Sequence, residues 1–261
     1  MRLRWATGQR AEWDFDDTIS TLAERSASPG LIVALRRSIA FFDPQDGTLE
    51  TLHEPESHQP GNRFNDGKCD AQGRFWVGSM DVECKAPTGS LYCVTRDGER
   101  ASTSIACAWP ANFPVINGPT WSLDGRTMWL NDTARNFIHR CGFEPARGAV
   151  ANPTVWLRFG KGDGYPDGMT TDRDGRLWIA HWGGGCVTCH ASDDGRELAR
   201  IVLPTSNVTN VAFGGPELRT LFVTSAAAEL SPQQRATQPL AGALFAVETD
   251  ATGLAPHRFA G

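Results

Sequence analysis

The stretch Asn65-Asp66-Gly67-Lys68, with the strand-like segment Arg74-Phe75-Trp76-Val77 behind it, decides the fold because its pattern returns three more times. Each copy places a polar turn containing Asn or Asp 10 to 12 residues before an aromatic residue in a hydrophobic strand. The other copies are Asn117-Gly118 before Trp129, Asp167-Gly168 before Trp178, and Asn210-Val211 before Phe222. The four aromatic residues lie 53, 49 and 44 residues apart. Repeats of this length, each with several short strands, are typical of β-propeller blades.

The polar residue of each turn has nearly the same phase in its repeat. In a propeller, equal phase means equal distance from the axis, so we expect Asp66, Asn117, Asp167 and Asn210 to meet near a central channel. Polar side chains on buried inner strands are costly unless they are paired. The ring is therefore a candidate metal or substrate site. The alternative is that these side chains only satisfy backbone groups at the strand ends.

A weaker fifth copy leads from Ser20 into Leu31-Ile32-Val33-Ala34. Before it, Leu3-Arg4-Trp5 and Glu12-Trp13-Asp14-Phe15 resemble the outer hairpin of a further blade whose inner strand is missing. The last strands, at residues 244–247 and 257–259, are expected in the final blade. The sequence thus predicts an all-β, six-bladed β-propeller with an incomplete first blade, forming one domain over residues 1–261.

Composition agrees with a single large core and limits the partners. Hydrophobic residues make up 40% of the chain, which has nine Trp and a net charge of −5. This balance gives no reason to expect a nucleic-acid or membrane partner. The longest aliphatic run, at residues 31–35, is too short to span a bilayer. No apolar segment follows the basic start of the chain, so we expect no signal peptide and a cytoplasmic location.

The seven Cys are odd in number and scattered, which favours reduced thiols. Cys186-Val187-Thr188-Cys189-His190 matches the attachment pattern of c-type haem. We expect no haem here, because the segment falls where the third strand of a blade should begin. A zinc site is also not expected, since no second Cys pair has the required spacing.

Two further features have competing interpretations. Trp76, Trp129 and Trp178 could stack on sugars, but their position in strands favours packing between blades. His181 and Trp182 end one of these strands. They could contact a substrate at the mouth of a pocket, or they could simply cap the end of the strand.

Taken together, the turns resemble the regucalcin/gluconolactonase family, and most closely its bacterial sugar-acid lactonases. The resemblance rests on Arg63-Phe64-Asn65-Asp66-Gly67-Lys68-Cys69-Asp70, Gly73-Arg74-Phe75-Trp76-Val77-Gly78-Ser79-Met80, Asn117-Gly118-Pro119-Thr120-Trp121-Ser122 and Tyr165-Pro166-Asp167-Gly168-Met169. It extends over essentially the whole chain.

That resemblance implies a six-bladed propeller with one divalent metal ion on its axis, which hydrolyses a sugar lactone (an aldonolactone) to the aldonic acid. By position, Asn117 and Asp167 match metal ligands, and Asp167 also matches the proton acceptor. Arg63, Asn65 and Glu83 match substrate-binding residues. The family's third ligand is a Glu in a Glu-Gly-Pro turn of the first inner strand, which this sequence lacks. A segment upstream of Met1 could supply it, and without that Glu we expect weaker metal binding and low activity.

The residue types suit this chemistry. Amide and carboxylate oxygens favour Ca²⁺, Mg²⁺ or Mn²⁺, and the sequence does not distinguish these from Zn²⁺ or Fe²⁺. A metal ion can polarise the lactone carbonyl while a base activates water. The rival interpretations are a lactone or ester hydrolase with a less polar substrate, and a non-catalytic propeller that binds metal or a partner. The polar set of Arg63, Asn65 and Glu83 favours a sugar-like substrate, because a site for apolar esters should be lined by apolar residues.

Overall fold

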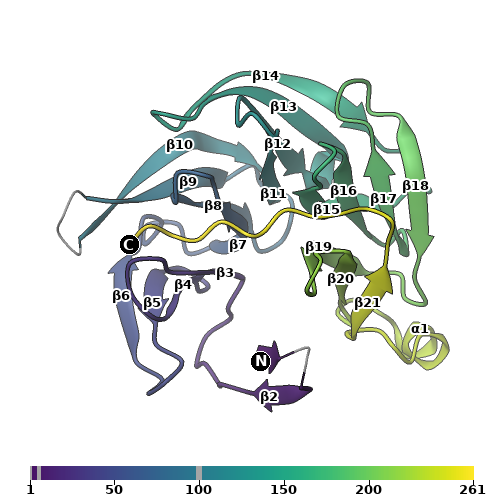
Figure 1. Ribbon diagram of the computed structural model, residues 1–261, viewed down its shortest axis with the longest axis horizontal. Helices are drawn as coiled ribbons and strands as arrows, with labels where there is room; N and C mark the ends of the chain where they lie inside the picture. Colours follow the sequence, from purple (N-terminus) through teal and green to yellow (C-terminus); the bar gives the residue numbers. More distant parts are fainter. Residues whose placement is uncertain (1, 5–6, 98–101) are drawn as a thin grey trace.

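Five antiparallel sheets succeed one another around a common axis in the computed structural model, which describes residues 2–4, 7–97 and 102–261 (Figure 1). Four of these blades have four strands and the fifth has three. The first two blades comprise β3 (Thr21–Glu24), β4 (Leu31–Ala34), β5 (Ile39–Phe42) and β6 (Leu49–His53), then β7 (Asn62–Cys69), β8 (Phe75–Asp81), β9 (Gly89–Arg96) and β10 (Thr103–Phe113).

The remaining blades follow in chain order. The third and fourth comprise β11 (Ile116–Trp121), β12 (Thr127–Asp132), β13 (Phe137–Glu144) and β14 (Ala149–Arg158), then β15 (Tyr165–Thr171), β16 (Leu177–Trp182), β17 (Cys186–His190) and β18 (Glu197–Val202). The fifth comprises β19 (Val208–Gly214), β20 (Thr220–Ser225) and β21 (Leu244–Glu248). Helix is confined, within the described residues, to the 3₁₀ turn η1 (Thr133–Arg135) and to α1 (Pro232–Thr237).

Neighbouring inner strands pack against each other in the order β3, β7, β11, β15, β19. The all-β propeller and the single ring of blades are therefore as predicted. The number of blades is not, because the described chain forms five blades rather than six.

The N-terminal segment explains the difference. β1 (Arg2–Arg4) and β2 (Gln9–Ala11) form an isolated two-stranded sheet, which lies between the first and fifth blades in the view of Figure 1. Strands of three residues make too few ladder hydrogen bonds and too small a face to build a blade. Residues 12–15, predicted as an outer strand, form no strand. Trp13 and Phe15 instead pack against Phe42 with ring centroids 6.0 and 4.7 Å away.

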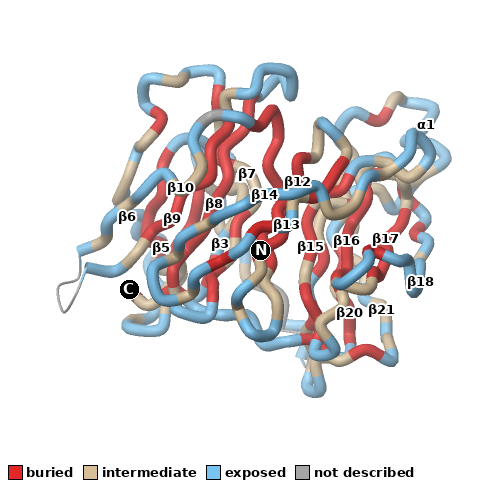
Figure 2. The backbone as a smooth tube through the Cα atoms, turned by 90° about the horizontal axis from the view of Figure 1, so that it is seen from above, coloured by how far each residue is buried: buried red, intermediate tan, exposed pale blue. Residues whose placement is uncertain are grey.

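The core lies between adjacent blades, and buried stretches follow the strands while the turns stay exposed (Figure 2). Trp76, Trp129 and Trp178 are 0%, 2% and 5% exposed, so the prediction that they pack between blades is confirmed. The predicted third strand at Cys186–His190 is also confirmed: it is β17, and all five of its residues are buried.

A hydrogen-bonded turn is repeated in the second and fourth blades. In the second, Asp70 Oδ2 accepts from Arg74 Nε at 2.6 Å and from Trp76 Nε1 at 2.8 Å. In the fourth, Asp172 Oδ2 accepts from the equivalent Arg176 and Trp178 at 2.7 and 2.8 Å. The other carboxylate oxygen of each Asp, Oδ1, accepts a hydrogen bond from the backbone N–H of the same Arg. Each Asp therefore joins the turn to the buried Trp of the following strand.

The C-terminal tail connects distant blades (Figure 1). After β21 it forms a bridge between Gly253 and Asp172 of the fourth blade. It then forms a parallel bridge between Phe259 and Arg25 beside the first blade, where Phe259 is fully buried. Residues 257–259 therefore do not extend the last blade as predicted, because Phe259 finds its hydrophobic partners across the ring.

The repeated turn yields a stability prediction. Asp172→Ala should lower the free energy of unfolding by about 3 kcal/mol, because it removes the acceptor of the buried Trp178 Nε1–H and of the partly buried Arg176 Nε–H. Asp174→Ala is the matched control: Asp174 pairs with the same Arg176, but its side chain is 70% exposed. It should cost less than about 1 kcal/mol. Urea unfolding of both variants measures the difference, and equal losses would contradict a special role for Asp172.

Candidate functional site

The candidate site lies where the inner strands begin. β7 carries Arg63, Asn65 and Asp66, and the next three inner strands carry Asn117, Asp167 and Asn210. In all four strands the pairing with the second strand shifts register at or beside these residues. β-Bulges of this kind turn side chains out of the regular alternation and are common next to active sites. They allow consecutive residues such as Asn65 and Asp66 to reach different neighbours.

A chain of hydrogen bonds joins the second, third and fourth blades. Arg63 Nη1 donates to Asn65 Oδ1 at 2.8 Å, and Asn65 Nδ2 donates to Asn117 Oδ1 at 2.8 Å. Asn117 Nδ2 donates to Thr133 Oγ1 at 2.9 Å, and that hydroxyl donates to the Pro166 carbonyl at 2.7 Å. The structure thus brings Arg63, Asn65 and Asn117 together and connects them to the residue before Asp167.

Asp66, the residue after Asn65, links β7 to two further inner strands. Its Oδ2 accepts from the Gly118 N–H at 3.0 Å, and its Oδ1 accepts from Asn210 Nδ2 at 3.2 Å. Lys68, two residues further on, donates from Nζ to the Met169 carbonyl at 2.6 Å. Asp66 thus bonds Asn210 directly and the backbone beside Asn117, and its charge acts on Asp167.

Asp167 stands in an unfavourable place for an isolated carboxylate. Burial raises its pKa well above the usual value, and the negative charge of Asp66 raises it further. The Gly168 N–H and the charge of Arg63 oppose this shift only in part. Burial also raises the pKa of Asp66, against the attraction of Lys68. Two neighbouring half-buried carboxylates, one of which has no paired cation among the described residues, favour the binding of a positive ion.

Glu83 is placed differently from the other predicted residues. It lies in the exposed loop after β8, where its carboxylate is 3.6 Å from Lys85 Nζ. Partial desolvation raises the pKa of the next residue, Cys84, and the Arg63 guanidinium opposes that shift, so the loop lies near Arg63. Within the described residues, no hydrogen bond or ion pair joins the Glu83 side chain to Arg63, Asn65, Asn117 or Asp167.

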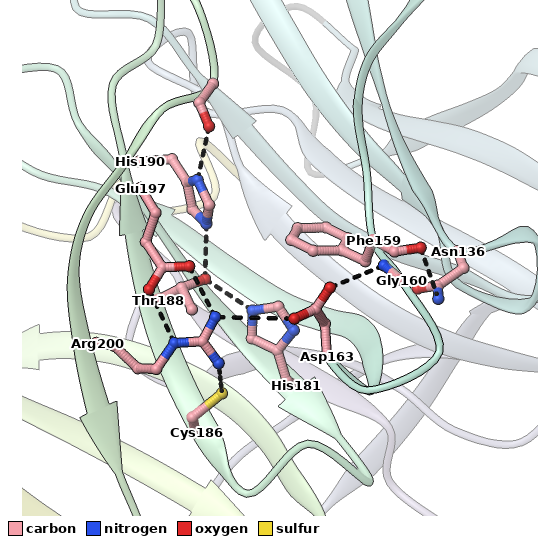
Figure 3. A network of polar contacts seen from close by, with 11 residues as sticks. Asn136, Phe159, Gly160, Asp163, His181, Cys186, Thr188, His190, Glu197 and Arg200 are labelled. Carbon is pink, nitrogen blue, oxygen red and sulfur yellow. Dashed lines mark hydrogen bonds and ion pairs between the residues drawn. The ribbon is translucent and has the colours of Figure 1, made fainter.

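His181 lies on β16, next to the strand that carries Asp167, and belongs to the polar network drawn in Figure 3. It is fully buried and pairs in register with Pro166, so it is not accessible for the substrate contact considered above. Its Nε2 and the Nε2 of His190 both lie within 2.8 Å of Thr188 Oγ1, and His190 Nδ1 bonds the Gly195 carbonyl. A carbonyl only accepts, so neutral His190 carries its proton on Nδ1. Thr188 therefore donates to His190 and accepts from His181.

The same network holds the loop that leads into Asp167. Asp163 Oδ2 accepts from the Gly160 N–H at 2.8 Å, and its other oxygen lies 3.9 Å from Arg200. Arg200 is itself paired with Glu197 at 2.7 Å and bonds the Cys186 sulfur at 3.4 Å. These contacts limit the freedom of residues 160–164 (Figure 3). Sequence reasoning missed this support because it depends on side chains from three different strands or loops.

The donor set fits an oxygen-preferring cation. Asn117 Oδ1 accepts a hydrogen bond from Asn65 and keeps a second lone pair, and Asp167 has no ion-pair partner in the described structure. Carboxylate and amide oxygens of this kind bind Ca²⁺ or Mg²⁺. No cluster of three His, Cys, Asp or Glu side chains is arranged for a metal within the described ranges. An ion bound here by Asp167 would therefore need the Asn117 amide oxygen and further ligands that are not carboxylates.

Among the described residues, no helix is long and apolar enough to cross a membrane. Two surface cavities lie away from this site, one beside Trp178 and one beside Arg74. Neither is lined by Asp66, Asn117, Asp167 or Asn210.

Comparison with known proteins places this geometry in a family. The chain is 34% identical over 247 residues to the putative sugar lactone lactonase YvrE of Bacillus subtilis, covering 95% of this chain and 82% of that protein. It is 35% identical over 251 residues to the L-arabinolactonase of Azospirillum brasilense, covering 95% and 80%.

A solved structure shares the fold over the same extent. The calcium-binding protein regucalcin of Agrobacterium tumefaciens superposes with a TM-score of 0.90 at 28% identity, covering 98% of this chain and 84% of that one. Residues 1–227 match the family described as the SMP-30/gluconolactonase/LRE-like region. The resemblance seen in the turns is confirmed, and the chain belongs to the SMP-30/gluconolactonase/LRE-like family.

Proposed function

We propose that this protein is a metal-dependent lactonase that hydrolyses a sugar-acid lactone to the corresponding aldonic acid. The observation that carries the proposal is the hydrogen-bonded set of Arg63, Asn65 and Asn117, whose charge acts on the half-buried carboxylate of Asp167 through Arg63. Relatives at 34–35% identity are named as sugar lactone or arabinolactone lactonases, which supports lactone hydrolysis as the reaction.

Asn117 and Asp167 would hold the divalent ion on the axis. When bound, the ion would supply a Lewis acid for the lactone carbonyl. Asn65 holds the Asn117 amide by donating to its oxygen, and Thr133 accepts from its nitrogen. The amide is therefore fixed in orientation before any ligand arrives. Pre-organised groups of this kind avoid reorganisation during the reaction.

Asp167 would act as the general base. A base is most effective when its pKa lies near the working pH. Burial and the charge of Asp66 raise the pKa of Asp167, and a bound cation would oppose that rise. The carboxylate could accept the proton of the attacking water with the oxygen that does not face the ion. The Asp163 and His181 contacts behind β15 would keep that carboxylate in place.

Arg63 and Asn65 would bind the substrate hydroxyl groups. Arg63 uses Nη1 to bond Asn65 and the Phe64 carbonyl, so its Nη2 group has no hydrogen bond to protein in the described structure. A guanidinium and an amide offer both donors and acceptors, as a polyol requires. Glu83 would join them if its exposed loop turns toward Arg63 when substrate binds. This set of polar groups favours a sugar lactone over an apolar ester.

A second candidate function is metal binding without catalysis. It is favoured by the likeness to a regucalcin described as a calcium-binding protein. The two functions share the ion but differ in turnover. A lactone-hydrolysis assay with metal-loaded and chelated protein distinguishes them, because a pure binding protein shows no rate above the uncatalysed reaction in either state.

The first functional prediction concerns the base. Asp167→Asn should reduce kcat for aldonolactone hydrolysis by roughly 100-fold or more, the usual contribution of general-base catalysis. The substitution keeps the side chain nearly isosteric. Asp193→Asn, at an exposed position on the other side of the fourth blade, is the control and should keep the wild-type rate. Full activity in Asp167→Asn would rule out this residue as the base.

The second prediction separates metal binding from turnover. Adding Ca²⁺ or Mn²⁺ to chelated protein should raise the melting temperature, because an ion that binds only the folded state stabilises it. Asn117→Ala and Asp167→Asn should lose this shift, whereas Arg63→Gln should keep it and raise KM instead. Thermal unfolding with and without metal, beside kinetics of Arg63→Gln, gives both readouts. A metal-induced shift retained in Asp167→Asn would place the ion elsewhere.

A further inference from the structure

A cavity of about 450 Å³ lies between the second and third blades, away from the ring. Its walls come from the β7–β8 turn, from β9 and β10, from the β13–β14 turn and from Ala260 of the C-terminal tail. The β7–β8 turn follows the end of β7 opposite to Arg63. From Arg63 to the end of β7 at Cys69 is six residues at about 3.3 Å each, so the cavity lies roughly 20 Å from Arg63 along the strand.

The charge of this cavity differs from that of the whole protein. Three of its lining residues are arginines, Arg74, Arg96 and Arg147, and none is Asp or Glu. The chain as a whole has more acidic than basic residues, 30 against 25. Desolvation raises the pKa of Cys93, the one lining thiol, to about 12, so it adds no negative charge.

Arg74 is held rigidly at the base of the cavity. Its Nε donates to Asp70 at 2.6 Å, and its Nη2 donates to the Pro145 carbonyl at 2.7 Å. The guanidinium also lies 5.6 Å from the Phe143 ring centre. These contacts occupy Nε and Nη2 and leave Nη1 without a protein acceptor in the described structure. Only 10% of the side chain is exposed, so a free donor pair stands at a nearly buried position.

The other two arginines flank this base from both blades. Arg96 Nη1 donates to the Ala260 carbonyl at 3.2 Å, and its other donors have no hydrogen-bond acceptor among the described residues. Arg147 makes no side-chain hydrogen bond within the described residues and sits in the β13–β14 turn. Guanidinium groups present paired donors that match the oxygens of a phosphate.

Small residues keep the cavity open beside these charges. Ala106, Ala108 and Ala146 line it together with Gly148. A Cβ atom on Gly148 would lie 2.6 Å from Arg74 Nη1, and the residue has a positive φ of 66°. Glycine at this position therefore leaves the free Nη1 group accessible. The volume falls within the usual range for small-molecule sites and exceeds what a single phosphate ion would fill.

We propose that this cavity is a binding site for a small phosphorylated metabolite about the size of a sugar phosphate. The phosphate would lie against Arg74 Nη1, with Arg96 and Arg147 closing on it from either side. The alanine and glycine surfaces would cover the uncharged part of the ligand. This inference does not depend on the proposed lactonase activity, because it concerns a different part of the molecule.

Calorimetric titration with inorganic phosphate, glucose 6-phosphate and glucose, at constant ionic strength, tests the site. We expect glucose 6-phosphate to bind more tightly than inorganic phosphate, and glucose not to bind. Arg96→Gln with Arg147→Gln should weaken glucose 6-phosphate binding by roughly tenfold or more, because charge-assisted hydrogen bonds are lost. Both side chains are exposed, so the double variant should fold, and its melting temperature checks this.

The matched control is Arg140→Gln with Arg173→Gln, which removes the same charge from two exposed arginines outside the cavity. It should keep the wild-type affinity. An equal loss in both double variants would mean that general surface charge attracts the phosphate, which overturns the site. Unchanged binding in the Arg96/Arg147 variant, absence of binding, or no preference for glucose 6-phosphate over inorganic phosphate would overturn it as well.

Discussion

The segment Asp66-Gly67-Lys68 bonds to every other inner strand of the ring, and the architecture depends on it. Asp66 accepts from Gly118 on β11 and from Asn210 on β19, while Lys68 donates to Met169 on β15. Thr21 on β3 completes the set by donating to the Gly67 carbonyl at 2.9 Å. A Cβ atom at Gly67 would meet the Trp76 backbone at 2.4 Å, so no larger residue fits. Polar groups on the axis are thus paired with each other, which offsets the cost of removing them from water.

This pairing has consequences for the chemistry of the site. Asp66 is occupied by two backbone N–H groups and an amide, so it serves the framework and not the substrate. Its charge nevertheless acts on Asp167, whose pKa it raises. A carboxylate engaged in structure therefore helps to set the basicity of a carboxylate free to react. The network around His181 and Arg200 supports the strand and the loop that carry Asp167, so the proposed base is held from two sides.

Much of the fold could be predicted because it repeats. The spacing of the turns located the blades, and the Trp residues and the Cys186–His190 strand took their predicted places. The predicted number of blades was wrong because the repeat pattern counts segments that resemble strands. β1 and β2 have only three residues each, which is too few to build a blade. The partner of Phe259 could not be predicted either, since it lies more than 200 residues away and outside any repeat.

The site was predictable in its residue types but not in its geometry. Equal phase indicated that Asp66, Asn117, Asp167 and Asn210 would meet, yet the bulges that aim them leave no clear sequence signal. Glu83 shows the limit of spacing arguments, because an exposed loop can hold a residue near a site without turning it inward. The Arg74 cavity was missed for a different reason. Arg74 and Arg96 come from different parts of the second blade and Arg147 from the third, and only the tertiary arrangement brings their donors to one place.

Two sets of contacts close the ring, one near its axis and one at the far ends of the inner strands. β19 and β3 do not pack together as the other neighbouring inner strands do in the described chain. The hydrogen bond from Asn210 to Asp66 crosses this interval on the inside, although the two residues are 144 positions apart. At the far ends of the inner strands, the tail runs from the Gly253 bridge to Phe259, whose backbone pairs with Glu24 and Ser26 at 2.8 Å. The Gly73 carbonyl accepts a hydrogen bond from the Ala260 N–H, and Gly73 belongs to the turn that also contains Arg74. The tail therefore stabilises the ring and at the same time forms one wall of the arginine-lined cavity, so a ligand bound there would add contacts at the same junction.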